Sequence, residues 1–211
     1  SHSITLHDPI RLKSVNLNRG LKGWSVKGTP VDCAKIALKS LLKKKPDLLI
    51  SGINLGSNLG KNLIYSGTIS AAYEGTILGI PSAAISLDSC QAKDFTVAKK
   101  VSTSIATYLL KNKLPKGIML NVNIPYIKKN NIKGFRITKQ GRSSFIDTFE
   151  KRVDPRGRSY FWIKGKIKNI DSSIEYDGEA ILNGYVSITP IDFELTNNRF
   201  INKLEQELKD G

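Results

Sequence analysis

The sequence predicts an α/β fold: a three-layer core with a mostly parallel sheet, extended by an antiparallel β-hairpin and a C-terminal helix. Three observations predict it. Short apolar runs alternate with segments of helical periodicity in the first part of the chain. From about Gly134 the pattern changes to strands that follow one another closely, and the last residues repeat apolar positions at helical spacing.

The first predicted helix begins at residues 29–32. Thr29 can cap it, Pro30 suits the first helical position, and Asp32 can bond back to the cap. Apolar residues then recur at helical spacing until the polar run at residues 43–46, where we expect the helix to end.

A βαβ unit follows. Residues 47–51 and 82–87 are short apolar runs typical of strands buried on both faces, and a small-residue helix at 67–78 lies between them. A further helix at 95–111 leads to a strand at 118–124 that Pro125 closes.

The second half predicts strands at 135–139, 145–153 and 160–163, with a tight turn at 154–157 between the last two. The chain returns through a strand at 185–189 that stops at Pro190, and it finishes in a helix at 196–208.

The chain is strongly basic, with 33 Lys plus Arg against 18 Asp plus Glu and a formal net charge of +15. Such an excess is compatible with a nucleic-acid surface. The lysines are scattered, however, and no stretch alternates basic with aromatic residues, so the distribution does not favour one. No apolar run is long enough for a membrane span and the start lacks a secretory pattern, so we expect a cytoplasmic protein.

The segment that carries chemistry is residues 51–68, SGINLGSNLGKNLIYSGT. It follows a predicted buried strand and opens a predicted helix, the position at which parallel α/β sheets bind ligands. Ser66, Gly67 and Thr68 at the helix start would direct N–H groups and hydroxyls at an anion, and phosphate is the natural ligand.

The segment is not a Walker loop, because three residues rather than four separate Gly56 from Gly60 and Asn62 replaces the required Ser or Thr. Asn54, Asn58 and Asn62 supply carbonyl oxygens that a hard cation accepts, normally alongside a carboxylate, and residues 51–68 contain none.

The string SGINLGSN followed by YSGT resembles the SurE family of survival-protein nucleotidases, and the resemblance extends from GTPVDCAKIAL to GYVSITPIDFELT. It implies a Rossmann-like core and a phosphatase that uses one divalent metal ion, Mg²⁺ or Mn²⁺, to hydrolyse nucleoside 5′- and 3′-monophosphates. It also implies homodimers or tetramers built through an exchanged hairpin and the C-terminal segment.

The resemblance assigns individual roles as well. Asn54 would be a metal ligand, whereas Asn58, Ser66, Gly67 and Thr68 would line the phosphate and substrate pocket. An adjacent Asp-Asp pair that ligates metal is expected before Ser1, so the catalytic carboxylates are not assigned to any residue of this chain. Asn62 occupies a position at which the family usually has aspartate.

By this interpretation residues 1–133 form the core without its first βαβ unit, 134–183 the hairpin extension for oligomerisation, and 184–211 the return strand and terminal helix. Two alternatives stay open. One is a basic RNA- or nucleotide-binding module without hydrolytic activity, and the other is a truncated, inactive chain that folds only through oligomer contacts.

Overall fold

The computed structural model describes residues 3–209 and contains a five-stranded sheet in the order β3-β4-β5-β9-β6. Strands β3, β4 and β5 are mutually parallel, β9 is antiparallel to β5, and β6 is parallel to β9. The mostly parallel sheet confirms the predicted α/β fold class. The strand bounds are β3 Leu49–Leu55, β4 Ser82–Asp88, β5 Ile118–Pro125, β6 Phe135–Ile137 and β9 Val186–Asp192.

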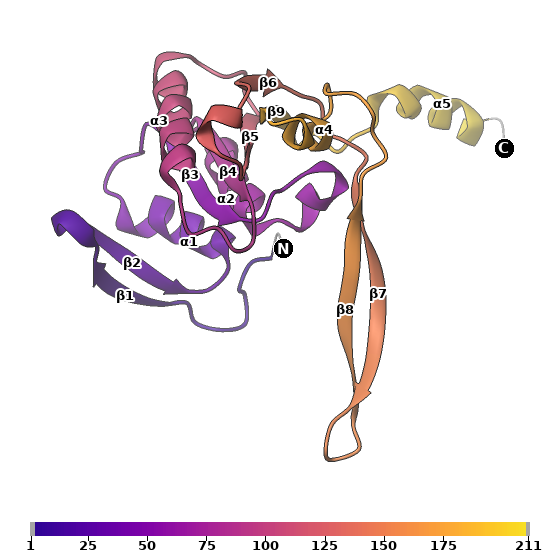
Figure 1. Cartoon of the computed structure of the whole chain (residues 1–211), viewed down its shortest axis with the longest axis horizontal. Helices are drawn as coiled ribbons and strands as arrows, with labels where there is room; N and C mark the ends of the chain where they lie inside the picture. Colours follow the sequence, from indigo (N-terminus) through magenta and orange to yellow (C-terminus); the bar gives the residue numbers. More distant parts are fainter. Residues whose placement is uncertain (1–2, 210–211) are drawn as a thin grey trace.

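Helices accompany the sheet (Figure 1). The α-helices are α1 Pro30–Ile36, α2 Gly67–Ile77, α3 Thr96–Lys111, α4 Asp177–Leu182 and α5 Asn198–Lys209. Helix α1 continues into a π-turn, η2 Ala37–Leu41, and short 3₁₀ helices occur at η1 Asn18–Gly20, η3 Gly60–Tyr65 and η4 Lys129–Asn131.

Two apolar cores on opposite faces of the sheet produce three layers. Successive residues of a strand point to opposite faces, so Ile85 packs into the core that contains Ile105 of α3, whereas its neighbour Ala84 packs into the core that contains Ala72 of α2. Both faces of the central strands are therefore covered, which explains why their sequences are almost continuously apolar.

The predicted start of α1 is confirmed. The hydroxyl of Thr29 accepts the N–H of Asp32 at 3.1 Å, and the Asp32 carboxylate accepts the N–H of Thr29 at 2.8 Å, which together form a capping box. Asp32 is only 1% exposed and also accepts two hydrogen bonds from Thr5.

Several strand ends differ from the prediction: β8, which spans Ser159–Lys168, runs beyond Ile163, and β6 ends at Ile137 rather than Lys139. Strand β3 continues beyond Ser51 to Leu55 because, after an irregularity, its pairing with β4 resumes at Asn54. Strand β9 passes through Pro190 to Asp192 rather than stopping there. Proline has no N–H to donate to a neighbouring strand. It is tolerated at position 190 because β6, the neighbour on that side of β9, ends opposite Ile188.

An N-terminal hairpin and helix α4 were not predicted. The hairpin consists of β1 Arg11–Asn16 and β2 Lys22–Lys27, paired antiparallel. Most of its residues are exposed, including Trp24 at 50%, so the alternation of buried and exposed positions that identifies a strand is weak. Helix α4 has six residues, too few for its periodicity to stand out in the sequence.

The long hairpin of β7 Ser144–Val153 and β8 Ser159–Lys168 extends away from the core (Figure 1). Its predicted turn is confirmed, because the N–H of Gly157 bonds to the carbonyl of Asp154 at 2.9 Å. Near the hairpin base, a Cβ added to Gly165 would lie 2.6 Å from the Phe145 ring, so glycine allows this ring to cover the neighbouring strand.

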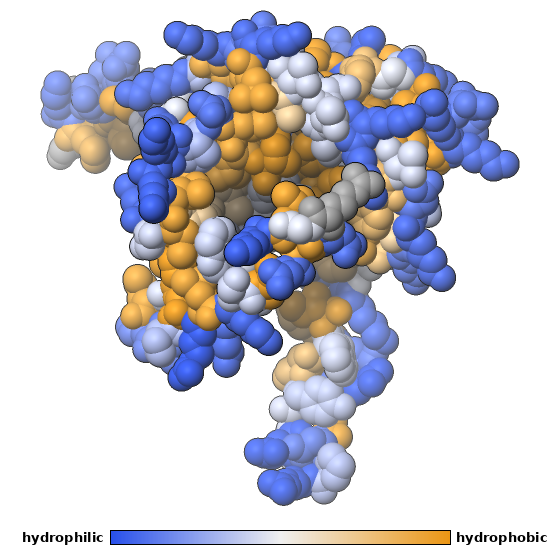
Figure 2. Space-filling model, turned by 90° about the vertical axis from the view of Figure 1, so that its left-hand side faces the viewer, coloured by the Kyte–Doolittle hydropathy of each residue, from blue (hydrophilic) through white to orange (hydrophobic). Residues whose placement is uncertain are grey.

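The surface of this hairpin is rich in apolar side chains. Figure 2 shows it below the body, with hydrophobic residues along its shaft and mostly hydrophilic residues at its end. Phe149 and Ile163 pair across the two strands, and each is 63% exposed. Among the described residues β7 and β8 form a two-stranded sheet of their own, and such a hairpin is only marginally stable in water when isolated. Exposed apolar side chains in this number are therefore unusual.

The division into 1–133, 134–183 and 184–211 stays a prediction. One observation bears on its second range: β6, at Phe135–Ile137, pairs with β9 in the main sheet, so the excursion from the core begins after it. Within residues 3–209, none of the helices combines the length and the apolar character needed to cross a membrane.

Substitution of Asp32 by Asn should destabilise the chain. Burial alone would raise the pKa of Asp32, but the hydrogen bonds from Thr5 and Thr29 outweigh it and lower the pKa from 3.8 to about 2. A lowered pKa means that this stabilisation is fully present above about pH 4 and is lost as the pH falls towards 2; the shift corresponds to about 2 kcal/mol.

In denaturant unfolding, the free energy of unfolding of Asp32→Asn should therefore be about 2 kcal/mol below that of wild type near neutral pH. This difference in free energy should become smaller as the pH is lowered. The exposed Asp47 provides the control, because Asp47→Asn should change stability by no more than about 0.5 kcal/mol. Equal stability of Asp32→Asn and wild type at neutral pH would contradict the prediction.

Candidate functional site

The carboxyl ends of β3, β4 and β5 meet at one edge of the sheet because these strands are parallel. Polar residues occupy these ends: Asn54 on β3, Ser86 and Asp88 on β4, and Asn123 on β5. In an open α/β sheet this edge is where ligands bind. The segment after β3 crosses it on the way to α2.

Asn58 is the point at which this segment is attached to the sheet. Its N–H donates to Oδ1 of Asn123 at 2.8 Å, and its carbonyl accepts from Asn121 at 2.9 Å and from Asn123 at 3.0 Å. Its side-chain amide donates to the hydroxyl of Ser86 at 2.7 Å. The three partners are fully buried, so these bonds are shielded from water.

The role predicted for Asn58, a contact with the substrate, stays a prediction, and the structure adds a supporting role to it. Both its peptide groups and its side-chain amide bind β4 and β5. Asn121 and Asn123 were not singled out from the sequence. The signal was present as two asparagines alternating within the otherwise apolar strand LNVNIP, since a polar residue in a buried strand needs a partner.

Asn54 has a fixed orientation at the end of β3. Its Nδ2 donates to the carbonyls of Leu55 at 3.1 Å and Gly56 at 2.8 Å. Because two carbonyls can be satisfied only by the nitrogen, the amide cannot flip without losing both bonds. Its Oδ1 accepts no hydrogen bond from the described residues and is therefore a candidate ligand for a hard cation.

A carboxylate lies at the same edge. Asp88 is the last residue of β4, and its Oδ1 accepts the hydroxyl of Ser57 at 2.6 Å. Neither residue was singled out from the sequence, because they are distant in it and each alone resembles an ordinary loop residue. Across residues 3–209, no group of three or more His, Cys, Asp or Glu side chains could hold a metal ion. Asn54 thus fits as one oxygen ligand of a site that further carboxylates must complete.

The start of α2 is shaped to receive an anion. Ser66 is the N-cap, and its hydroxyl accepts the N–H of Ile69 at 3.2 Å. The N–H groups of Gly67 and Thr68 lie in the first turn, where no carbonyl of the helix can accept them, so they point out of the helix end. The positive end of the helix dipole lies at the same place. Ser66 is 8% exposed, while Gly67 and Thr68 are partly exposed. The accessible donors are therefore those of the latter two residues.

Two helix starts lie side by side here. A Cβ at Gly67 would be 2.7 Å from Cγ of Pro30, the first residue of α1, so the close approach requires glycine. A groove of about 460 Å³ extends from Pro30 and Gly28 to Ser51 and Gly52 on β3. The groove thus lies between α1 and the first half of β3, and Ala71 is the residue that α2 contributes to its lining.

Asn62 does not face this groove. Its Oδ1 accepts the N–H of Phe145 at 3.2 Å, at the base of the long hairpin. The structure thus gives this asparagine a contact with the hairpin, while Asn54, Asp88 and the start of α2 remain the polar groups that can receive a ligand.

Comparison with known proteins agrees with this geometry. The model of the family described as Survival protein SurE matches residues 1–147. A protein of Thermoanaerobacter sp. strain X514, named 5′-nucleotidase SurE, is 47% identical over 205 residues, which are 97% of this chain and 81% of that protein. The 5′-nucleotidase SurE of Heliobacterium modesticaldum is 41% identical over 211 residues, covering 100% of this chain and 78% of that protein.

The fold has a solved counterpart. The crystal structure of the SurE protein from Aquifex aeolicus superposes with a TM-score of 0.80 at 38% identity and covers 99% of this chain and 83% of that one. Sequence and fold agree over nearly the full length, and the matched family model includes the whole segment from Asn54 to Thr68. The chain therefore belongs to the SurE family.

Proposed function

We propose that this chain is a metal-dependent phosphatase that hydrolyses nucleoside 5′- and 3′-monophosphates to nucleoside and phosphate. The relatives named 5′-nucleotidase SurE support the reaction class. The observation that carries the proposal is the start of α2, where Ser66 caps Ile69 and the N–H groups of the partly exposed Gly67 and Thr68 are left for an anion. A cytoplasmic location, expected from the sequence, is part of the same proposal.

The phosphate group of the substrate binds at the start of α2. The N–H groups of Gly67 and Thr68 donate to its oxygens, and the hydroxyl of Thr68 adds a third donor. The helix dipole favours the negative charge that the phosphoryl group carries throughout the reaction. Ser66 keeps this helix start intact by capping Ile69, so its contribution is chiefly structural.

Asn54 supplies an oxygen ligand to the divalent cation, Mg²⁺ or Mn²⁺. When bound, such an ion supplies positive charge that polarises the phosphoryl oxygens. The two carbonyls that accept from Nδ2 of Asn54 fix the orientation of its amide, so its Oδ1 would serve as a preoriented oxygen ligand when the ion binds. The resemblance implies that carboxylates accompany Asn54 at the metal, and Asp88 lies at the same sheet edge.

The long hairpin and α5 form contacts between copies of the chain. Phe149, Phe161 and Ile163 alternate along one face of the hairpin and are more than half exposed. Helix α5 likewise carries Phe200 and Leu204 at 45% and 43% exposure, on a helix that projects from the body (Figure 1). Apolar surface of this extent supports a homodimer or tetramer.

Replacement of Asn54 by Ala should weaken metal binding at least roughly tenfold and lower metal-dependent phosphate release accordingly, because one oriented oxygen ligand is lost. The measurement is phosphate release from a nucleoside monophosphate at graded Mn²⁺ and Mg²⁺ concentrations, with the full-length protein.

Asn112 provides the matched control. It follows α3 and bonds to the carbonyl of Tyr108, near the amino end of β5, so Asn112→Ala should retain wild-type metal dependence. Wild-type turnover of Asn54→Ala at all metal concentrations would remove Asn54 from the metal site. RNA binding with steep salt dependence, and no phosphate release by the wild type, would favour the binding-module alternative.

A double replacement of Phe149 and Ile163 by Ser should shift the protein to a smaller assembly, because it removes two apolar side chains that share one face of the hairpin. Sedimentation velocity gives the mass, and circular dichroism checks the fold. Lys166→Ser, at an exposed position on the opposite face, should leave the mass unchanged. An unchanged mass of the double variant would refute the hairpin as an oligomer contact.

A further inference from the structure

The loop that leads into α2 is bound to the base of the long hairpin. Three hydrogen bonds join them: Gln140 Nε2 to the carbonyl of Gly60 at 2.9 Å, the N–H of Lys61 to the carbonyl of Ser143 at 2.9 Å, and the N–H of Phe145 to Oδ1 of Asn62 at 3.2 Å. The loop side of this contact is the start of η3, which ends immediately before the N-cap of α2.

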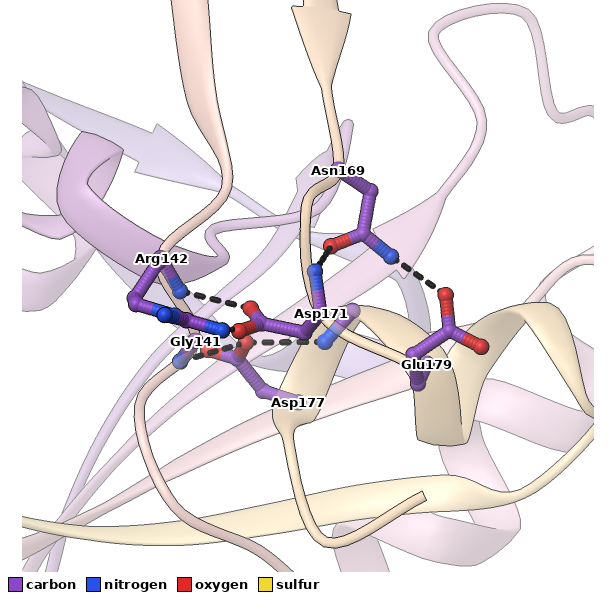
Figure 3. Close-up of polar contacts among 7 residues, drawn as sticks. Gly141, Arg142, Asn169, Asp171, Asp177 and Glu179 are labelled. Carbon is purple, nitrogen blue, oxygen red and sulfur yellow. Dashed lines mark hydrogen bonds and ion pairs between the residues drawn. The ribbon is translucent and has the colours of Figure 1, made fainter. Parts of the chain in front are cut away.

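One buried carboxylate connects the same two segments. The side chain of Asp177 is fully buried and points toward Gly141 (Figure 3). Its Oδ2 accepts the N–H of Gly60 at 2.9 Å, and its Oδ1 accepts the N–H groups of Gly141 at 2.9 Å and Gly178 at 2.8 Å. A single side chain of α4 therefore fixes one peptide of the loop and one peptide at the hairpin base.

The backbone around Asp177 is packed so closely that side chains are excluded. A Cβ at Gly141 would lie 2.6 Å from Oδ1 of Asp177. Gly60 has a φ of +56°, in the left-handed region, and a Cβ there would collide with Ser143. Both glycines are needed for the N–H groups to reach the carboxylate.

A second carboxylate lies beside the first but has a different connection. Asp171 accepts the N–H of Arg142 at 2.7 Å and its Nε–H at 2.9 Å (Figure 3), and among the described residues it accepts no hydrogen bond from the loop before α2. Asp171 and Asp177 are 6% and 0% exposed. The pair thus supplies a comparison between two buried carboxylates, of which only one binds the loop.

The charge at Asp177 is costly to bury. Removal from water raises the pKa of Asp177, and the nearby negative charge of Asp171 adds to the rise. The three N–H groups that Asp177 accepts lower this pKa without cancelling the rise. A neutral residue of similar shape would avoid that cost but could not accept on both oxygens, because an amide nitrogen has no acceptor site. Aspartate is therefore required because both of its side-chain oxygens accept backbone N–H groups.

We propose that Asp177 is a positioning residue for the candidate phosphate site: it fixes the Gly60 turn, and through η3 the start of α2, relative to the hairpin base. This inference rests on the proposed function. It also couples the hairpin to the phosphate site, because movement at Gly141 is transmitted to Gly60 through the two oxygens of one carboxylate.

The test compares Asp177→Asn with Asp171→Asn in the full-length protein. Binding of inorganic phosphate by calorimetry is measured first, since it does not depend on turnover, and kcat and KM for a nucleoside monophosphate follow. Asp177→Asn should weaken phosphate binding about tenfold and raise KM by a similar factor, because the start of α2 is no longer fixed. Asp171→Asn should lower thermal stability yet keep wild-type phosphate affinity and KM.

Gln140→Ala keeps the proposal testable if Asp177→Asn does not fold. Gln140 is exposed, so the variant should fold normally while losing one bond to Gly60, and it should weaken phosphate binding in the same direction by a smaller factor. Wild-type phosphate affinity in both Asp177→Asn and Gln140→Ala, or an equal loss in Asp171→Asn, would overturn the positioning role. If wild type itself neither binds nor releases phosphate, the failure lies instead with the proposed function.

Discussion

The attachment of Asn58 to two neighbouring strands is the interaction on which the rest of the site depends. A segment rich in glycine and asparagine has many conformations in the unfolded chain, and ordering it costs conformational entropy. Four hydrogen bonds to buried side chains of β4 and β5 offset part of that cost and fix the segment over the sheet edge. With the segment fixed at Asn58 and again at Gly60, the orientation of Asn54 before it and of α2 after it is determined.

The site is therefore built from groups whose hydrogen bonds are mostly internal, with a few donors and acceptors left to face solvent. The amide of Asn54 uses its nitrogen internally, and the hydroxyl of Ser66 caps a helix. What remains accessible is an oxygen on β3 and N–H groups at the start of α2. Because the internal hydrogen bonds already fix the groups that face solvent, a ligand can bind without reorganising them.

Local sequence signals were sufficient to predict several elements of the fold. Thr29, Pro30 and Asp32 form the predicted capping box because all its bonds lie within one turn. The strands at residues 82–87 and 118–124 are mostly apolar runs, so their burial was visible in composition alone. The turn at residues 154–157 was predictable because proline and glycine occupy positions that few other residues tolerate.

Contacts between distant residues could not be predicted in the same way. The bond between Gly60 and Asp177 joins residues 117 positions apart, and nothing near Asp177 in the sequence distinguishes it from an ordinary helix-start aspartate. Asn121 and Asn123 acquire their role only once β5 lies beside the loop. Asn54 and the start of α2 were identified by motif, but their surroundings depend on tertiary packing.

The Phe145 ring over Gly165 has a mechanical consequence. Because the ring covers the strand where glycine leaves room, the two strands pack closely at the base of the hairpin, and beyond it they pair only with each other within residues 3–209. Because the hairpin is long and extends from the body (Figure 1), a small rotation at its base would move its tip by a much larger distance.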